Sequence, residues 1–424
     1  MAIDPQVQVT DLSGNPVTGV SVTFTVTGGG GTAAAVAQTD ASGFAAVTWT
    51  LGGTAGANTL DASAALSGGT STVSFTATGL AGSAGRLAMV TQPSASAQSG
   101  VVFAQQPVIQ LQDQNGNNVS TSGVAITAQS SGSLGGNTVA VSVNGVATFT
   151  NLSLTGLAGG YQLTFTGTNL TGVTSAAIAL GAGAASKLVV VTQPSSPTPS
   201  GTPFVQQPVV QVQDAAGNPV ASSGRSVTAA INGSVGSLNP AGRTVVTDAA
   251  GLATFQTLTV SGPAGSYSLL FSTTGLTPDV SANFDITAGG ATQMTATSAT
   301  SQSATVGTTV AAPPTVLVQD AQNNPVAGVA VTFQVTAGGG ALNGGAAVTD
   351  NNGVAAVTSW TLGPVAGANT VTASASGLPT VTFNATGTAG AATQVVLTTQ
   401  PSTSAANGAV FATQPVAQLR DANG

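Results

Sequence analysis

Side chains that usually carry catalysis are almost absent from this chain of 424 residues. It has no His and no Cys, and its twelve acidic residues are all Asp. General acid–base catalysis needs His, or a Glu, Asp or Lys whose pKa is shifted in a cleft. Lys187, the one lysine, follows a Gly- and Ala-rich stretch at the start of an expected strand, where we expect a solvated cation. The sequence therefore predicts no enzyme activity, no catalytic residue and no cofactor.

The repeated aspartates raise the question of a calcium site. Ca²⁺ takes roughly 6–8 oxygen ligands, usually with several carboxylates close together in the sequence. Here the turn aspartates come singly or in distant pairs, such as Asp11 with Asp40 and Asp320 with Asp350, and no Asp-x-Asp run occurs. An Asp that accepts hydrogen bonds from backbone N–H groups two residues further on explains them as turn formers. We therefore expect no metal site.

The composition argues against several classes of partner. Only 4% of the residues are charged and the net charge is −7, which leaves no basic patch for nucleic acid. With 42% hydrophobic residues the chain is not of the disordered type. No run of about 18 apolar residues occurs, so we expect no membrane-spanning helix. Met1 leads straight into an expected strand, and we expect no signal peptide in these residues.

One strand-and-turn stretch recurs along the chain and positions several of the aspartates. Val210 and Val212 alternate with Gln211 and Gln213, which is the period of a strand with one buried face. The Asp-x-x-Gly-Asn-Pro that follows predicts a turn in which Gly takes a positive φ and Pro fixes the next φ. The predicted turn residues are Asp11 and Gly14, Asp113 and Gly116, Asp214 and Gly217, Asp320 and Asn323, and Asp421 and Gly424.

The aspartates of these turns are spaced by 102, 101, 106 and 101 residues, which is the length of one immunoglobulin-like β-sandwich. We therefore predict an all-β chain of four tandem immunoglobulin-like β-sandwich domains in an extended rod, followed by a partial repeat. The predicted boundaries are 1–85 for repeat 1, 86–186 for repeat 2, 187–288 for repeat 3, 289–390 for repeat 4, and 391–424 for the partial repeat, called the tail below.

Aromatic residues distinguish two kinds of repeat. Trp49 and Trp360 lie in alternating stretches of repeats 1 and 4, where a core position is expected more often than a ligand platform. Tyr161 and Tyr267 follow Ala-Gly-x in repeats 2 and 3. We expect each of them to be a tyrosine corner, whose hydroxyl ties the start of a strand to backbone upstream.

Three turn motifs, Asp-x-x-Gly-Asn-Pro-Val, Thr-Asp-x-x-Gly and Ala-Gly-x-x-Thr, run through repeats 1 and 4. They lie at 11–17, 39–43 and 55–59, and again at 320–326, 349–353 and 366–370 with Asn in place of the first Gly; repeat 2 has Ser142-Val143-Asn144-Gly145 instead of the second turn. Together they resemble bacterial immunoglobulin-like domains of the invasin and intimin type. The resemblance implies a cell-surface stalk or adhesin shaft, and similar modules also occur in phage structural proteins.

Repeat 1 differs from repeats 2 and 3 because no lead strand precedes its organising strand. Repeats 2 and 3 open with a lead strand that starts 27 residues before the turn Asp, and the tail repeats this spacing from Gln394 to Asp421. We expect either that the tail of one copy supplies a strand to repeat 1 of the next, or that the chain is a fragment of a longer array. The residues of this candidate inter-subunit strand are Val395, Val396, Leu397, Pro401, Phe411, Val416 and Leu419.

The sequence thus predicts a structural protein that is extracellular or on the bacterial cell surface. It would be a stalk or filament subunit built of immunoglobulin-like spacers, with further copies of itself as partner in head-to-tail assembly. The alternative is an adhesin fragment that binds a host or surface ligand, or a phage fibre or decoration module. A binding module needs a loop set in one repeat that breaks the pattern, and none stands out in the sequence.

Overall fold

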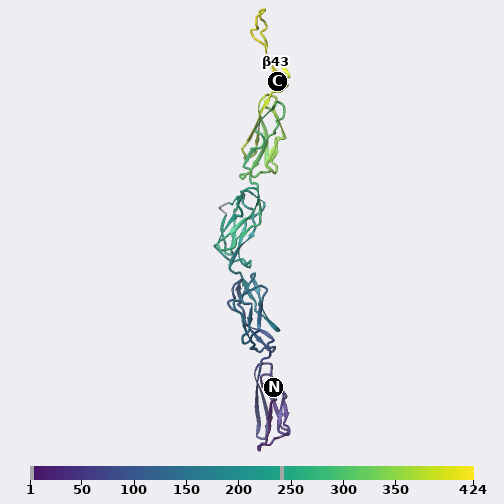
Figure 1. Cartoon of the computed structure of the whole chain (residues 1–424), viewed down its shortest axis with the longest axis vertical. Helices are drawn as coiled ribbons and strands as arrows, with labels where there is room; N and C mark the ends of the chain where they lie inside the picture. The colour runs from purple at the N-terminus through teal and green to yellow at the C-terminus, as the bar shows by residue number, and fades with distance from the viewer. Residues whose placement is uncertain (1–3, 239–242) are drawn as a thin grey trace. The chain divides into compact units, whose positions relative to one another are not determined.

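The computed structural model describes residues 4–238 and 243–424; residues 1–3, at the start of repeat 1, lie outside this range. Every regular element in the described residues is a β-strand (Figure 1). The predicted all-β class is therefore confirmed. The chain divides into two compact units, Met1–Ala185 with Gln213–Val220, and Ser186–Val212 with Ala221–Gly424. The four repeat boundaries stay a prediction, and the repeats are used below as names for those ranges.

Repeat 4 shows two sheets that share one lead segment. Its strands are β33 (Gln293–Ala296), β34 (Ser301–Thr305), β35 (Thr315–Gln319), β36 (Ala330–Ala337), β37 (Ala341–Asn343), β38 (Ala346–Val348), β39 (Val354–Ala356), β40 (Ser359–Thr361), β41 (Gly367–Ser374) and β42 (Val381–Thr388). One sheet runs β33-β35-β39, the other runs β34-β42-β41-β36-β38, and β37 pairs with β40. The lead segment gives β33 to the first sheet, antiparallel to β35, and β34 to the second, parallel to β42. This is an immunoglobulin-like sandwich.

The core of repeat 4 follows from the period-two alternation of its strands. Val331 and Phe333 are buried on one face of β36, whereas the residues between and beside them are exposed. They pack with Val371, Phe383 and Trp360. Full burial of a side chain of this size contributes about 1.5–3 kcal/mol. Trp360 is 0% exposed and its counterpart in repeat 1 is 4% exposed, which confirms the predicted core positions.

Repeats 2 and 3 have a related plan, but their strands divide into sheets differently. The strands of repeat 2 are β9 (Arg86–Thr91), β10 (Ser96–Gln98), β11 (Val108–Gln112), β12 (Ala125–Gln129), β13 (Ser133–Gly135), β14 (Val139–Val141), β15 (Val146–Thr148), β16 (Ser153–Thr155), β17 (Gly159–Tyr161), β18 (Thr164–Gly167), β19 (Leu170–Thr174) and β20 (Ile178–Gly181). The strands of repeat 3 are β21 (Ala185–Thr192), β22 (Thr198–Pro199), β23 (Val209–Asp214), β24 (Ser226–Ile231), β25 (Ser237–Leu238), β26 (Thr244–Val246), β27 (Leu252–Thr254), β28 (Val260–Ser261), β29 (Gly265–Tyr267), β30 (Leu269–Ser272), β31 (Asp279–Val280) and β32 (Phe284–Thr287). Repeat 2 has the sheets β14-β12-β18-β19-β9-β11-β15 and β10-β20-β17, and repeat 3 has β21-β23-β27, β22-β32-β29 and β26-β24-β30-β31. Lead strand β9 pairs with β11, and after Pro93 the chain joins the other sheet as β10, parallel to β20.

The two tyrosines occupy the predicted corners. The Tyr161 hydroxyl donates to the carbonyl oxygen of Leu157 at 2.9 Å. The Tyr267 hydroxyl donates to the carbonyl oxygen of Pro263 at 2.8 Å. In both repeats the ring therefore fixes the loop that precedes its own strand, and the prediction is confirmed.

Repeat 1 has fewer strand partners than the other repeats. Its strands are β1 (Gln6–Gln8), β2 (Ser21–Gly28), β3 (Thr32–Ala33), β4 (Val36–Gln38), β5 (Phe44–Ala46), β6 (Trp49–Thr50), β7 (Gly56–Leu66) and β8 (Gly69–Gly79). Within the described residues β1 pairs with β5 alone, and the main sheet runs β4-β2-β7-β8. The run from Phe44 to Trp49 contains parts of two strands, β5 and β6. The chain breaks between them because β5 pairs with β1 while β6 pairs with β3.

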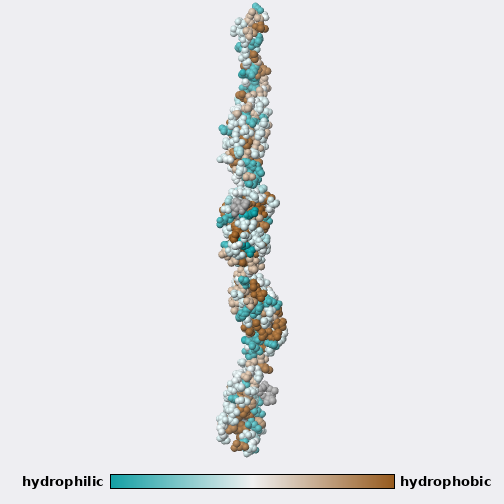
Figure 2. Space-filling view, turned by 90° about the vertical axis from the view of Figure 1, so that its left-hand side faces the viewer, coloured by the Kyte–Doolittle hydropathy of each residue, from teal (hydrophilic) through white to brown (hydrophobic). Residues whose placement is uncertain are grey.

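The tail forms a hairpin of β43 (Gln394–Thr399) and β44 (Val416–Arg420), drawn in yellow in Figure 1. Its candidate strand residues are not covered: Val395 is 72%, Phe411 44% and Leu419 69% exposed. Elsewhere the surface in Figure 2 is mostly pale, neither strongly hydrophilic nor strongly hydrophobic, with separate brown patches. Such a surface is expected where Thr, Ser, Gly and Ala, and few charges, cover the strands.

Candidate functional site: the Asp–Asn clamp

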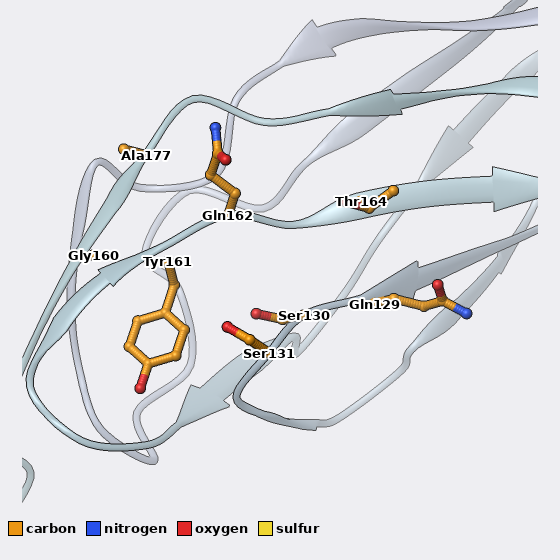
Figure 3. A pocket seen from close by; sticks show the side chains of 8 residues that line it. All are labelled: Gln129, Ser130, Ser131, Gly160, Tyr161, Gln162, Thr164 and Ala177. Carbon is orange, nitrogen blue, oxygen red and sulfur yellow. The ribbon is translucent and has the colours of Figure 1, made fainter.

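The described residues hold no group of three or more acidic side chains placed to bind a metal ion. Nor does any helix in that part of the chain reach the length and apolarity needed to span a membrane. A hollow in repeat 2 is open and lined by Gln129, Ser130, Tyr161 and Gln162 among others (Figure 3). Its tyrosine hydroxyl is already used by the corner. The lining includes Ser and Thr hydroxyls but no Asp, Lys or Arg side chain beside them to activate a nucleophile.

The recurrent Asp turn is the polar feature that the repeats share, with the same hydrogen bonds and a positive φ at the same position. In the first copy the Asp11 N–H donates to the Asn15 carbonyl at 2.8 Å, and Asp11 Oδ1 accepts the N–H groups of Ser13 and Asn15. Positive φ is required at the fourth residue, and the values at Gly14, Gly116, Gly217, Asn323 and Gly424 are 87°, 90°, 99°, 61° and 84°. Asn is the side chain that tolerates this region best after Gly, which accounts for Asn323.

In repeat 2 this turn also binds backbone of repeat 1. Asp113 Oδ2 accepts the N–H of Gly82 in the linker at 2.9 Å. Asn117, four residues after the Asp, donates from Nδ2 to the Gly53 carbonyl at 2.7 Å, and its Oδ1 accepts the Ala55 N–H at 2.8 Å. The same Nδ2 reaches Asp113 Oδ2 at 2.8 Å. We call this Asp and Asn pair, with its linker and loop partners, the Asp–Asn clamp.

The clamp recurs with nearly the same distances. In the first unit, Asp214 accepts the Gly183 N–H at 2.7 Å, and Asn218 bonds to the Gly156 carbonyl at 2.9 Å and the Ala158 N–H at 2.6 Å. In the second unit, Asp320 accepts the Gly289 N–H at 2.8 Å. Asn324 bonds to the Gly262 carbonyl at 3.0 Å and to the Ala264 N–H at 2.6 Å. Asp421 repeats the linker bond, to Gly390, at 2.8 Å.

Close backbone packing explains why the linker residue is Gly. A Cβ on Gly289 would lie 2.6 Å from the carbonyl oxygen of Ser200, closer than a carbon atom and a carbonyl oxygen normally approach. Gly183 meets the carbonyl of Ser99 in the same way. A larger residue would push the linker N–H away from the carboxylate. At Gly183 and Gly289 the clamp therefore needs both the acid and a bare backbone opposite it, whereas a Cβ on Gly82 or Gly390 would meet no atom closer than 3.5 Å.

Burial makes these hydrogen bonds obligatory. Asp214 and Asp320 are 2% and 1% exposed, and a carboxylate removed from water must be compensated by donors. Burial alone raises the pKa of both, but the bonds from the clamp Asn and the linker Gly outweigh it, so each pKa lies below its ordinary value. The Asn117 side chain, aided by the Gly82 N–H, lowers the pKa of Asp113 to about 2.

Asp11 and Asn15 make the internal bonds of the turn but are exposed, with no bond to another repeat among the described residues. The Asn15 side chain lowers the pKa of Asp11 below its ordinary value. These two residues therefore provide a natural reference for the turn without the clamp.

Sequence reasoning identified the Asp and Gly of each turn but missed the Asn. The available signal was a second recurrence, namely Gly-x-Ala-Gly about sixty residues before each clamp Asn, at 53–56, 156–159 and 262–265. The backbone of these loops is the surface that the clamp Asn binds. Hydrogen-bond partners that belong to the main chain leave little trace in side-chain patterns.

No protein-family model and no curated protein sequence matches the chain. Among solved structures, FdeC, an Escherichia coli adhesin, is 19% identical, with a TM-score of 0.34, and the match covers 73% of this chain and 100% of that one. Invasin, a bacterial integrin-binding protein, is 16% identical with a TM-score of 0.27, over 93% and 78% of the two chains. The D0–D1 domains of intimin are 18% identical with a TM-score of 0.19, over 47% and 98%.

Invasin and intimin are the proteins whose repeats the turn motifs resemble. At these identities and TM-scores the likeness carries no argument of its own, so the assignment of the fold rests on the strand pairing described above. The fold and the clamp together define the class: immunoglobulin-like β-sandwich repeats in which a recurring Asp turn, inside each compact unit, forms hydrogen bonds with backbone that lies earlier in the chain.

We predict that Asn324→Ala opens the clamp without unfolding either of its neighbours. The Ala264 N–H, which donates to Asn324 Oδ1 at 2.6 Å, loses its acceptor. Its hydrogen exchange should become at least about tenfold faster, because one buried hydrogen bond contributes roughly 1.5 kcal/mol. Amide exchange measured by NMR or mass spectrometry on the full chain tests this. Asn15→Ala is the matched control and should leave Ala264 unchanged; equal exchange in all three proteins would contradict the clamp.

We also predict that acid loosens the contact made by Asp113. Its pKa in the folded chain is about 2, below the ordinary 3.8, so its contribution to stability is complete above about pH 4 and is lost as the pH falls towards 2. The chemical shift of the Gly82 N–H should titrate with a midpoint near 2. Asp113→Asn should abolish that titration, and a midpoint at or above 3.8 would show that the carboxylate is not held as described.

Proposed function

We propose that the chain is a structural stalk, outside the cell or on the bacterial cell surface, in which immunoglobulin-like repeats act as spacers and the Asp–Asn clamp sets how each meets the next. The observation that carries this proposal is the recurrence of one clamp, at the starts of repeats 2, 3 and 4, with the same atoms in the same roles. A flexible string of domains needs only a linker. Within each compact unit, three side-chain contacts and a buried carboxylate instead favour a defined orientation of the segments that the clamp joins.

The composition supports the same role. With no His, Cys or Glu and few charges, the chain has little chemistry to offer a substrate. What it does provide is length, since each repeat adds a further packed sandwich. An adhesin that recognises a surface ligand remains the runner-up, and it needs a recognition surface in addition to these spacers.

We predict that the clamp narrows the range of orientations between repeats 1 and 2. Spin labels on Thr70→Cys and Ser131→Cys, both exposed in the native chain, report the distance between the two repeats. Because the chain has no other Cys, labelling is specific. Pulsed electron paramagnetic resonance should give one narrow distance distribution for the labelled chain with an intact clamp. The distribution should become about twofold wider when Asn117→Ala is added and stay unchanged when Asn15→Ala is added. A broad distribution in the unmutated clamp would contradict the stalk.

The tail favours a second element of this function, head-to-tail assembly. Val395, Phe411 and Leu419 are exposed, whereas their counterparts in repeat 2, Leu87, Phe103 and Leu111, are 5%, 2% and 0% exposed. The tail strands thus carry side chains of the kind that pack into a sandwich core, but these side chains are exposed. Repeat 1 has the complementary arrangement in the described residues, because β1 and β8 each have one neighbour where their counterparts β35 and β42 have two. We propose that the tail of one copy adds to these edges in the next.

Light scattering on the 424-residue chain tests this assembly. The mean mass should rise with concentration, and Val395→Asp should keep the chain monomeric because a carboxylate would have to be buried at the new contact. A chain that stays monomeric at every concentration, with the tail cut rapidly by protease, would rule out assembly through the tail.

A further inference from the structure

Repeat 2 breaks the common pattern at the turn that follows β14. In the other repeats a Thr hydroxyl in this turn accepts a backbone N–H: Thr39 from Val20, Thr247 from Arg225 and Thr349 from Val329, at 2.9–3.0 Å. In repeat 2 the Ser142 hydroxyl accepts the Val124 N–H at 3.0 Å, which identifies the equivalent position. The next residue is Asp40, Asp248 or Asp350 in the other repeats. In repeat 2 it is Val143, which is 67% exposed.

The strand before this turn is also apolar on its outer side. Val139 and Val141 of β14 are 49% and 55% exposed, while Ala140 between them is buried in the core. Together with Val143 they form a row of alternate residues that we call the valine edge. Alternation places their side chains on one face of the sheet. The solvent-facing side of this strand therefore carries side chains that would normally be buried.

Repeat 3 carries two charges at the equivalent edge that are absent here, whereas repeats 1 and 4 have the uncharged Ala35 and Gly345, and Val20 and Val329, at these positions. In repeat 3 the Ala229 N–H donates to the Arg243 carbonyl, and in repeat 2 the Ala128 N–H donates to the Thr138 carbonyl. Thr138 of repeat 2 therefore occupies the position of Arg243 in repeat 3. Val124 likewise takes the position of Arg225. Natural proteins use such charges to keep exposed strand edges from pairing with other chains. The valine edge has none of them, and it also lacks the Asp of the turn.

The backbone of β14 is free to pair on its outer side. Within the described residues β14 lies at the end of its sheet, with β12 as its neighbour. The Thr138 carbonyl accepts a hydrogen bond from Ala128 of β12, and the Ser142 N–H donates to the carbonyl of Val124 in the loop before β12. Between them, Ala140 lies opposite Ile126. Because N–H and C=O groups alternate in direction along an antiparallel strand, those of Val139 and Val141 point away from the sheet. Two donors and two acceptors are thus available.

We propose that β14 pairs antiparallel with β14 of a second copy of this chain. The segment Val139-Ala140-Val141 reads the same in both directions, so a two-fold axis at Ala140 places Val139 of each copy opposite Val141 of the other. All four outward backbone groups find partners in this register, and valine meets valine on the exposed face. The low charge of repeat 2 imposes no repulsion between the copies. This lateral contact is independent of the clamp and of the tail.

Cysteine cross-linking tests the register. The full chain has no Cys, so Val139→Cys and Val141→Cys each introduce a single thiol. Facing residues in the proposed pair lie within disulfide distance, whereas identical residues lie on a diagonal. Under mild oxidation a mixture of the two variants should give at least about fivefold more covalent dimer than either variant alone. No dimer in the mixture, or equal yields from all three samples, would overturn the proposal.

Sedimentation velocity supplies the second measurement. Val143→Asp places a charge at an exposed position beside the paired strand, and Val141→Asp places one on that strand. Each should weaken self-association by roughly tenfold or more in the dissociation constant. Val246→Asp, at the position in repeat 3 equivalent to Val141, is the matched control and should change nothing. Association that survives both repeat 2 variants but is lost in Val395→Asp would assign it to the tail and refute the valine edge.

Discussion

A buried carboxylate needs more hydrogen-bond donors than its own turn supplies, and this shortage connects the repeats. Oδ1 of Asp320 is satisfied inside the turn by the N–H groups of Gln322 and Asn324. Oδ2 takes the side-chain amide of Asn324 and the Gly289 N–H of the linker. Because an unpaired charge in the interior is costly, the turn can be buried only with the linker in place. Burial of the turn and positioning of the linker are therefore coupled, whereas the exposed Asp11 turn forms its internal bonds without a linker.

Much of the architecture could be predicted from local rules. Alternation gave the strands, Asp and Gly gave the turns, and the spacing of the aspartates gave the size of the repeat. Prediction failed where an interaction joins residues far apart in the sequence. The run from Phe44 to Trp49 has an unbroken strand pattern, yet it changes partner from β1 to β3 in the middle. Asn is likewise common in turns of every kind, so its presence at 117 indicates no special role. That role depends on Gly53 and Ala55, more than sixty residues away.

Low charge has two opposite consequences for such a chain. Outward faces of Thr and Ser can bind water, but they give neighbouring molecules little electrostatic repulsion. Sheet edges then depend on a few isolated charges, such as Arg243 and Asp248 on either side of β26. Where these are replaced, as around Val143, the same scaffold presents a surface of another kind. The difference between a spacer and a contact site is thus a matter of two or three side chains.

The receiving half of each clamp consists of main-chain atoms alone, a carbonyl at Gly53, Gly156 or Gly262 and an N–H two residues later. The side chain between them differs each time: Thr54, Leu157 and Pro263. A repeat that keeps this loop offers the same two main-chain groups to the Asp turn of the next repeat, whatever side chain lies between them. Unequal recombination between gene copies would therefore lengthen or shorten the protein by whole modules and still produce working junctions.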